Sequence, residues 1–417
     1  QHFADDRVEL RGHVPAAGRG RRGRLGEYPA GPLHQGGAGG RGLGAREGGA
    51  AALAARGGRG SAGARLAREQ LGAAEESAVA AALRAVSLSG AAEARGWLRA
   101  EYVRRVREAW EALLLARAFA PESASGGPGG SPARPEPPPP VGPIAEFLQV
   151  ASADAFARAL RLAFRALALL EDASVVRSVQ RALRFARGRA RADALEGLSH
   201  LGDREAAQVL VVLLEPMPVE EKLGALRRAG TAPRDREEAL GRARRHPAPW
   251  VRQAAAAAAD SGDAAQEIAA MQRLLALRRV SLLSGLSLER LQAIARIARE
   301  AEYLAREVIV REGDPGDELF LLLSGRVDVL KNAGTPGEER VNPLGPGDYF
   351  GEMAILDGLA RSATVVATSD ARVLILAGAG LRELVHEMPE LAFDLFRILA
   401  ERLRRAEGGA ADPARGA

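Results

Sequence analysis

The spacing of apolar residues changes near residue 302, and this change limits what kinds of structure the chain can form. Before it, apolar residues recur every three or four positions, for example at Leu98, Tyr102 and Val106. After it, short apolar runs such as 308–310 and 373–376 are separated by turns rich in Gly, Pro and Asp. The first pattern is typical of helices and the second of short strands. The sequence therefore predicts a multidomain α + β chain, in which a helical block precedes a small β-barrel or β-roll.

The composition favours helices built from aliphatic side chains and excludes several kinds of site. Hydrophobic residues make up 47% of the 417 residues and aromatic residues only 4%, which is material for two or three domains. The absence of Cys excludes disulfides, thiolate zinc sites, iron–sulfur clusters and Cys nucleophiles. The strongest apolar stretch, residues 209–214, is much shorter than the roughly 18 apolar residues of a membrane-spanning helix. We therefore expect a cytoplasmic protein.

The positive charge of the chain comes almost entirely from arginine. A net charge of +5 would ordinarily raise the possibility of nucleic-acid binding. The basic residues are almost all Arg, however, since Lys222 and Lys331 are the only lysines. Together with abundant Ala, Gly and Pro, this is typical of a GC-rich coding bias, so we expect no nucleic-acid partner. The chain begins at Gln1 without an initiator Met, which suggests a piece of a longer protein.

The distribution of Gly, Pro and apolar residues predicts six segments. Residues 1–70 hold 18 of the 48 glycines without apolar periodicity, so we expect disorder there. A helical segment is expected at 71–120, and nine prolines make 121–143 a linker. Helices resembling HEAT repeats are expected at 144–270, a β-roll domain with flanking helices at 273–405, and a disordered tail at 406–417.

The helical block contains two informative local patterns. Around residues 98–114, one face is predicted to be apolar, with Leu98, Tyr102, Val103, Val106, Trp110, Leu113 and Leu114. The opposite face is expected to carry Arg104, Arg105, Arg107 and Glu108. Further along, His246-Pro-Ala-Pro-Trp-Val-Arg252 follows a helix at 235–245 and resembles the turn of a HEAT repeat. Because similarity at a fixed period is poor across 144–270, an α-solenoid and a helix bundle both stay open.

The C-terminal domain is predicted to begin with helices and to continue as strands. Ser287 is expected to cap a helix at 288–299. Strands are predicted at 308–310, 319–323, 327–330, 365–366 and 373–376, and helices at 380–386 and 389–405.

The segment between residues 347 and 365 carries the most specific chemistry of the sequence. A carboxylate at Glu352 is followed nine residues later by the guanidinium of Arg361, and then by Ser362, Ala363 and Thr364. A cyclic nucleotide requires this combination. The carboxylate can accept the ribose 2′-hydroxyl, the planar cation can pair with phosphate oxygens, and free backbone N–H groups can complete the anion site.

These residues resemble the phosphate-binding cassette of the cyclic-nucleotide-binding domain family. The family pattern is Phe-Gly-Glu-x-Ala-Leu, a short spacer, and then Pro-Arg followed by small residues. The matching residues here are Phe350, Gly351, Glu352, Ala354, Arg361, Ser362, Ala363 and Thr364. Supporting matches are the 274–286 entry, the 313–318 turn and Ser324-Gly325. The sequence departs from the pattern at Ala360, where Pro is usual, and at Ile355, where Leu is usual.

The resemblance implies a role for each matching residue. Glu352 would hold the ribose 2′-hydroxyl, Arg361 and Ser362 would hold the phosphate, and the amides around Gly351, Met353 and Ala354 would complete the site. Because Ser at 362 is compatible with cAMP whereas Thr is associated with cGMP, we expect cAMP or cGMP with a preference for cAMP. The last helix would close over the base with an apolar face formed by Leu395, Phe396, Leu399 and Leu403.

The order of the parts suggests a sensor of cyclic nucleotides and leaves one alternative. In the alternative, the helical block is a protein-interaction scaffold and the β-roll has lost its ligand. Enzymatic activity and a metal site are not expected, since His200, His246 and His386 lack metal-ligand spacing and no nucleophile motif occurs. Residues 191–198 and 250–252 weakly resemble the soluble half of bacterial nucleotide-transporter-like proteins. That resemblance implies a protein partner, or a membrane transporter domain in a longer parent chain.

Overall fold

The computed structural model describes residues 65, 67–73, 76–120, 142–226, 229–259, 265–387, 389, 392, 393, 396 and 400. The predicted tail at 406–417 and nearly all of the segments 1–70 and 121–143 lie outside these residues. The predicted last helix at 389–405 also lies mostly outside them, including Leu395, Leu399 and Leu403 of its apolar face. Among the described helices, none combines the length and the apolarity that crossing a bilayer requires.

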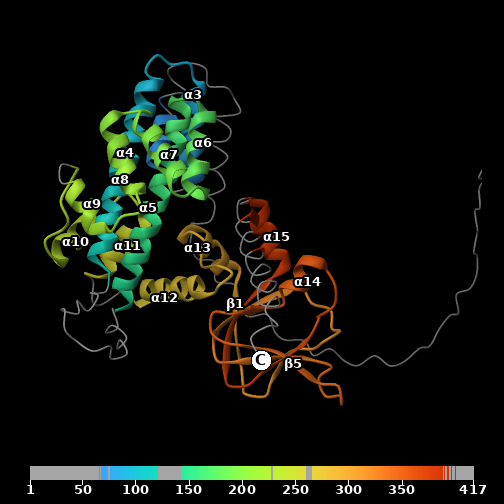
Figure 1. Cartoon of the computed structure of the whole chain (residues 1–417). Coiled ribbons are helices and arrows are strands. Elements are labelled where there is room, and N and C mark those ends of the chain that lie inside the picture. Colours follow the sequence, from blue (N-terminus) through green and yellow to red (C-terminus); the bar gives the residue numbers. More distant parts are fainter. Residues whose placement is uncertain are drawn as a thin grey trace, which may run out of the picture. The chain divides into compact units, whose positions relative to one another are not determined.

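The first part of the described chain is helical (Figure 1). Its elements are η1 (Gln70–Gly72), α3 (Glu76–Leu88), α4 (Ala94–Ala118), α5 (Pro143–Leu170), α6 (Ala173–Phe185), α7 (Arg189–Ser199), α8 (Arg204–Leu214), α9 (Val219–Ala225), α10 (Arg236–Ala243), α11 (Pro249–Ala257) and α12 (Ala265–Arg279). Asp172, Asp203 and Asp235 precede α6, α8 and α10, and each side chain accepts a hydrogen bond from a backbone N–H of the first turn. These caps define where three of the helices begin.

The two longest helices, α4 and α5, pack against each other and carry many of the buried side chains of this part. The apolar face predicted on α4 is confirmed, since Leu98, Tyr102, Val106, Trp110 and Leu114 are all buried. Burying a Leu, Val or Phe side chain contributes about 1.5–3 kcal/mol. The α4–α5 contact therefore accounts for much of the stability of the helical part.

The prediction that the charged residues of α4 point outward is wrong for Arg105 and Glu108. The side chain of Arg105 is 2% exposed and donates hydrogen bonds to the carboxylates of Glu101 at 2.7 Å and Glu108 at 2.6 Å. It also donates to the carbonyl oxygen of Leu71 in η1 at 2.9 Å. Helices α3, α8 and α10 contact α4 in addition to α5, so α4 is covered on more than one face.

The turn between α10 and α11 buries an imidazole. Nδ1 of His246 accepts a hydrogen bond from the N–H of Ala248 at 3.1 Å, and the side chain of His246 is buried. Val251 is buried next to it, and Trp250 meets Phe147 of α5 edge to face, with ring centroids 5.8 Å apart. The helix–turn–helix order of α10 and α11 is as expected from the sequence, whereas a HEAT repeat stays a prediction.

His246 is expected to make the stability of the chain depend on pH. Burial lowers the pKa of His246 from 6.5 to about 4, so the unfolded chain binds this proton first as the pH falls. The stabilisation by the neutral imidazole is complete above pH 6.5 and is lost progressively between pH 6.5 and pH 4. From pH 7 to pH 5 we expect a loss of about 2 kcal/mol in the free energy of unfolding.

Urea unfolding of the wild type and of His246→Asn at both pH values checks this prediction. Asn can still accept a hydrogen bond from the N–H of Ala248 but does not titrate. The variant should therefore lose less stability than the wild type on acidification. The same pH dependence in both proteins would show that His246 is not responsible.

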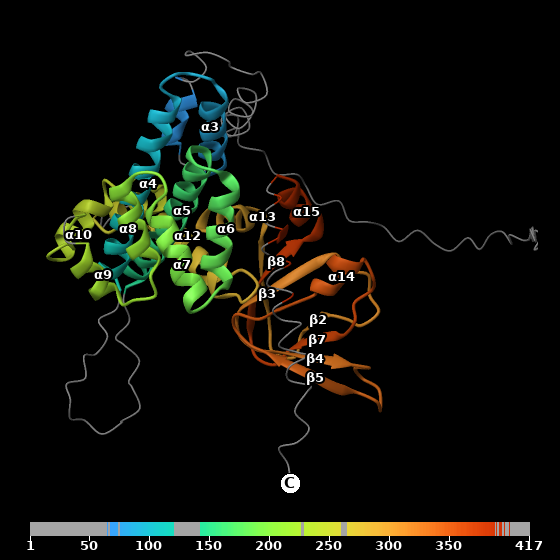
Figure 2. The ribbon, with the colours of Figure 1, turned by 45° about the horizontal axis from the view of Figure 1, so that its top comes forward.

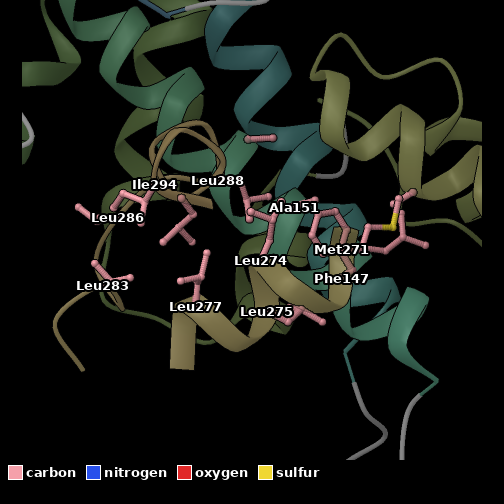
Figure 3. Packing of buried hydrophobic residues seen from close by; sticks show 14 of the residues in the cluster. Phe147, Ala151, Met271, Leu274, Leu275, Leu277, Leu283, Leu286, Leu288 and Ile294 are labelled. Atoms are coloured by element: carbon pink, nitrogen blue, oxygen red, sulfur yellow. The ribbon is translucent and has the colours of Figure 1, made fainter. Parts of the chain in front are cut away.

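Helices α12 and α13 (Leu288–Ile297) connect the helical part to the strands through one apolar core (Figure 3). This core contains Phe147 and Ala151 of α5, Met271, Leu274, Leu275 and Leu277 of α12, and Leu288 and Ile294 of α13. The same cluster extends to Leu321 and Leu374 in the strands. The boundary predicted at residues 270–273 lies inside α12. Ser287 caps α13 as predicted, because its Oγ accepts a hydrogen bond from the N–H of Arg290 at 3.4 Å.

The strands form two four-stranded antiparallel sheets that enclose a second apolar core (Figure 2). The strands are β1 (Arg299–Tyr303), β2 (Val308–Val310), β3 (Glu318–Ser324), β4 (Val327–Lys331), β5 (Glu339–Leu344), β6 (Tyr349–Phe350), β7 (Thr364–Ala367) and β8 (Ala371–Ala377). Their orders are β1-β8-β3-β6 and β2-β7-β4-β5. Phe320, Leu322, Val327, Val373 and Ile375 are among the residues buried between the sheets. The predicted β-roll is therefore present as an antiparallel sandwich.

The sequence does not predict three of the eight strands found in the described part of the chain, and all three lie at sheet edges. β1 and β6 are the outer strands of one sheet, and β5 is an outer strand of the other. β5 exposes five of its six residues and contains Pro343, and β1 has no fully buried residue. Edge strands can be polar and can contain Pro because one side of the strand has no partner. β1 and β5 therefore lack an apolar alternation, whereas β6 consists of two buried residues, Tyr349 and Phe350, and is too short to show any period.

Candidate functional site

The segment that the sequence singles out leaves the sandwich after β6 and returns to it at β7. It contains the short helix α14 (Glu352–Asp357), which begins after Gly351 and ends before Gly358. Both glycines have positive φ, at 85° and 69°. A Cβ on Gly351 would lie 2.6 Å from Nη1 of Arg361 and 2.7 Å from the carbonyl oxygen of Glu318. Glycine is therefore required at 351 for both its backbone conformation and the close approach of Arg361.

Arg361 is buried beneath this segment, with 6% of its surface exposed. Its Nη1 donates hydrogen bonds to the carbonyl oxygens of Glu318 at 2.8 Å and Gly351 at 3.3 Å. The guanidinium lies 5.4 Å from the ring centroid of Phe320, which stacks on Phe350 at 4.9 Å. These contacts hold the cation in one orientation between β3 and the start of α14.

The approach of Arg361 also depends on the turn between β2 and β3. A Cβ on Gly316 would lie 2.0 Å from Nε of Arg361, so any other side chain there would displace the guanidinium. The backbone of Arg361 is paired with the same turn. Its N–H donates to the carbonyl oxygen of Asp314 at 2.8 Å, and its carbonyl oxygen accepts from the N–H of Gly313 at 2.9 Å. The turn noted in the sequence therefore positions both the backbone and the side chain of Arg361.

The charge of Arg361 is only partly balanced by its surroundings. Burial lowers the pKa of Arg361, while the carboxylates of Glu318 and Asp317 act in the opposite direction. Asp317 is itself bound by Arg382 of α15 (Gly378–Glu387) through two hydrogen bonds, at 3.2 and 2.8 Å. An Arg side chain stays protonated in proteins, and it has five N–H donors. Among the described residues, both hydrogen-bond partners of this side chain are bound by Nη1, which leaves Nε and Nη2 as donors for an anion.

The other predicted site residues are distributed along the same segment. Glu352 and Gly351 are half-buried, Met353 is exposed and Ala354 is buried. Beyond Arg361, Ser362 is exposed, Ala363 is half-buried and Thr364 is buried. Thr364 Oγ1 accepts a hydrogen bond from the N–H of Glu312 at 3.0 Å, which fixes the end of the segment. The structure thus brings Gly351 into contact with Arg361, and the ligand contacts of the eight residues stay predictions.

Sequence reasoning missed several residues that shape the site. Glu318 supplies a carbonyl oxygen to Arg361, and Asp317 joins the site to α15. Lys331 at the end of β4 donates hydrogen bonds to the carbonyl oxygen of Ser362 and, at 3.1 Å, to Glu312. The only advance signals were the turn at 313–317 and the rarity of lysine. Neither signal indicates which side chains from other strands lie beside Arg361.

Part of the chain matches a known domain family. The family model described as a cyclic nucleotide-binding domain matches residues 300–388. The C-terminal part of the chain contains a cyclic nucleotide-binding domain. The match includes α14, α15 and all the strands apart from the first residue of β1.

Two relatives and one solved structure illustrate this similarity. A CRP-like cAMP-activated global transcriptional regulator of Mycobacterium tuberculosis is 29% identical over 136 residues, which are 33% of this chain and 61% of the regulator. A cAMP-dependent protein kinase regulatory subunit of Aspergillus niger is 39% identical over 115 residues, which are 28% of this chain and 27% of the subunit. The solved N-terminal domain of a transcriptional regulator from Streptomyces coelicolor A3(2) is 27% identical, with a TM-score of 0.30. That match covers 34% of this chain and 99% of the solved domain.

The match to the cyclic nucleotide-binding domain is confined to one part of the chain. This chain spans less than two thirds of the length of either relative. The family match begins at residue 300, so it leaves out α3 to α13.

Proposed function

We propose that this chain is a cyclic-nucleotide sensor whose ligand binds between α14 and the turn that precedes β3. The observation that carries the proposal is the buried guanidinium of Arg361, held by Gly351 and Glu318 with Nε and Nη2 left as donors. A planar cation with free donors is suited to two oxygens of one phosphate. Burial strengthens such a contact because less water screens the charges.

The remaining contacts follow the order of the segment. Ser362 adds a hydroxyl beside the phosphate, and the first amides of α14, at Met353 and Ala354, have no partner within the helix. Glu352 accepts the ribose 2′-hydroxyl. The ligand is cAMP or cGMP, and Ser362 together with two relatives whose names refer to cAMP supports cAMP. The proposed site contains no metal, and the protein acts as a regulator and not as an enzyme.

Ligand occupancy is proposed to be transmitted to the helical part through α12 and α13. These helices share one apolar core with α5 and with β3 and β8, which supports mechanical coupling. Coupling between two sites of a protein is typically about 1–3 kcal/mol. The output is a protein partner of the helical part, or a membrane transporter domain in a longer parent chain. The proposed location is the cytoplasm, or the inner face of a membrane if the parent carries such a domain.

Calorimetric titration of the full chain with cAMP, cGMP and AMP tests the proposal. We expect one site per chain that binds a cyclic nucleotide and does not bind AMP. Glu352→Gln should weaken cAMP binding by about tenfold, because a charge-assisted hydrogen bond is lost. The same variant should bind 2′-deoxy-cAMP as the wild type does, since that ligand lacks the hydroxyl.

Two results would count against the proposal. If a folded chain, checked by circular dichroism, binds neither cyclic nucleotide, the protein is better described as an interaction scaffold. If Glu352→Gln weakens cAMP and 2′-deoxy-cAMP equally, the nucleotide does not place its ribose at Glu352.

A further inference from the structure

A strongly basic stretch lies far from Arg361 in sequence, on α6 and the turn that leads into α7. Six arginines and no acidic residue occur between positions 177 and 191, namely Arg177, Arg181, Arg184, Arg187, Arg189 and Arg191. This stretch carries a charge of +6, whereas the whole chain carries +5. The first five of these side chains are exposed. We call these five residues the arginine ridge.

The packing of α6 directs the ridge away from the protein. Val176 of α6 is buried, and Val179 and Leu183 are partly buried in the same apolar cluster. Arg177, Arg181 and Arg184 follow one another at steps of four and three, so they form a second stripe on the helix. α6 packs against α5 and α7, and α6 and α7 lie side by side in both ribbon views (Figures 1 and 2).

The charge of the ridge is largely unbalanced within the protein. In the described ranges, no ion pair involves Arg181, Arg184, Arg187 or Arg189. Asp172 lies close enough to Arg177 to interact with it. Arg191 donates hydrogen bonds to the carbonyl oxygens of Leu183 and of Leu214, at 2.7 Å for the second, and so holds the corner between α6 and α7 together. The ridge therefore lies at a corner held by hydrogen bonds of Arg191 and presents, within the described chain, several arginines without an ion pair.

An exposed aromatic side chain lies beside the arginines at the C-terminal end of α6. Phe185 is 73% exposed, and the guanidinium of Arg184 lies 5.3 Å from its ring centroid. A hollow of about 590 Å³ opens beside Phe185 and is lined in part by Arg184, Arg187 and Arg191. Exposed large apolar side chains next to a cluster of cations are typical of surfaces that meet an interface between water and lipid.

We propose that the arginine ridge docks α6 on an anionic lipid bilayer, with the arginines at the headgroups and Phe185 at the boundary of the acyl chains. A bilayer fits better than a nucleic acid because acyl chains can cover the aliphatic residues that line the hollow beside Phe185, namely Leu183, Ala186 and Pro216. A nucleic acid offers phosphates to the arginines and stacking to Phe185, but it offers few apolar groups to cover these aliphatic side chains. This surface works without nucleotide, so the inference is independent of the proposed function.

Sedimentation of the full chain with vesicles tests the proposal. The chain should bind phosphatidylcholine vesicles that contain phosphatidylserine, should not bind pure phosphatidylcholine, and should be released by NaCl. Each arginine near an anionic surface is worth about fivefold in partitioning. Arg181→Gln/Arg184→Gln/Arg187→Gln should therefore bind about a hundredfold more weakly. Phe185→Ser keeps the charge and should reduce binding about tenfold, since the ring no longer enters the lipid.

A charge-matched variant is the control. Arg95, Arg236 and Arg245 are exposed and lie outside the ridge, and replacing all three with Gln removes the same charge. This control should bind anionic vesicles as the wild type does. If both triple variants lose affinity equally, only the net charge matters and the ridge is not the docking surface.

Competition experiments separate the bilayer from other sources of phosphate. Release of the chain by inorganic phosphate, at an ionic strength where NaCl has no effect, would assign a site for a free anion instead. Binding to an oligonucleotide with no binding to anionic vesicles would assign a nucleic-acid surface. Binding to pure phosphatidylcholine as strong as to the mixture would also overturn the proposal. If the triple variant does not fold, the wild-type salt dependence and Phe185→Ser decide the question.

Discussion

Arg361→Ala is expected to weaken cyclic-nucleotide binding by about ten- to a hundredfold. The substitution removes a charge-assisted contact worth about 1.5–3 kcal/mol, in a site where the guanidinium is buried and held by two carbonyl oxygens. Arg361→Lys should recover part of the affinity because it keeps the charge. The recovery should be incomplete, since Lys cannot bind a phosphate in the bidentate geometry of Arg. Calorimetric titration of both variants with cAMP measures the effect.

The control for Arg361 is a surface arginine of the same domain. Arg372 pairs with Glu300 at 3.0 Å and is half exposed, so Arg372→Gln should leave the affinity unchanged. Thermal unfolding of each variant distinguishes a lost contact from a lost fold, since Arg361→Ala also leaves the carbonyl oxygens of Gly351 and Glu318 without their donor. Unchanged cAMP affinity in a folded Arg361→Ala variant would remove Arg361 from the binding site.

Arg105→Ala is expected to cost about 3–5 kcal/mol in the free energy of unfolding, the largest effect on stability that we predict. Arg105 neutralises the carboxylates of Glu101 and Glu108, and all three side chains are almost fully buried. Without Arg105, Glu101 keeps its ion pair with Arg104 at 2.6 Å, whereas the remaining ion pair of Glu108 among the described residues is the longer one with Arg158, at 3.8 Å. The loss arises from leaving a charge buried without an adequate partner. Urea unfolding at neutral pH measures it.

An exposed ion pair between α4 and the cap of α8 is the matched control for Arg105. Arg99 meets Asp203 at 3.1 Å with most of its side chain in solvent, so Arg99→Ala should cost less than about 1 kcal/mol. If Arg105→Ala and Arg99→Ala lose a similar free energy of unfolding, burial does not make the Arg105 network contribute more to stability than an exposed ion pair. The free energy of unfolding would then depend on the number of ion pairs and not on where they lie.

Local sequence patterns predict a structural feature correctly when that feature depends on one short stretch of the chain. Ser287 caps α13 because a hydroxyl before a helix satisfies an N–H of the first turn, whatever the rest of the chain does. The central strands β3, β4, β7 and β8 are apolar because they are covered by the sandwich. The segment from Gly351 to Thr364 was recognised for the same reason, since its residue types and their spacing lie within fourteen positions.

The tertiary structure alone decided the features that depend on distant neighbours. On α4 considered by itself, Arg105 and Glu108 belong to an outer face, yet Arg105 binds the carbonyl oxygen of Leu71 in η1, and α3, α8 and α10 contact α4 in addition to α5. The surroundings of Arg361 come from Gly316, Glu318 and Phe320, which periodicity cannot assign to the site. The physical reason is that hydrophobic periodicity reports one buried face per element, whereas burial and charge pairing depend on every element packed around a residue.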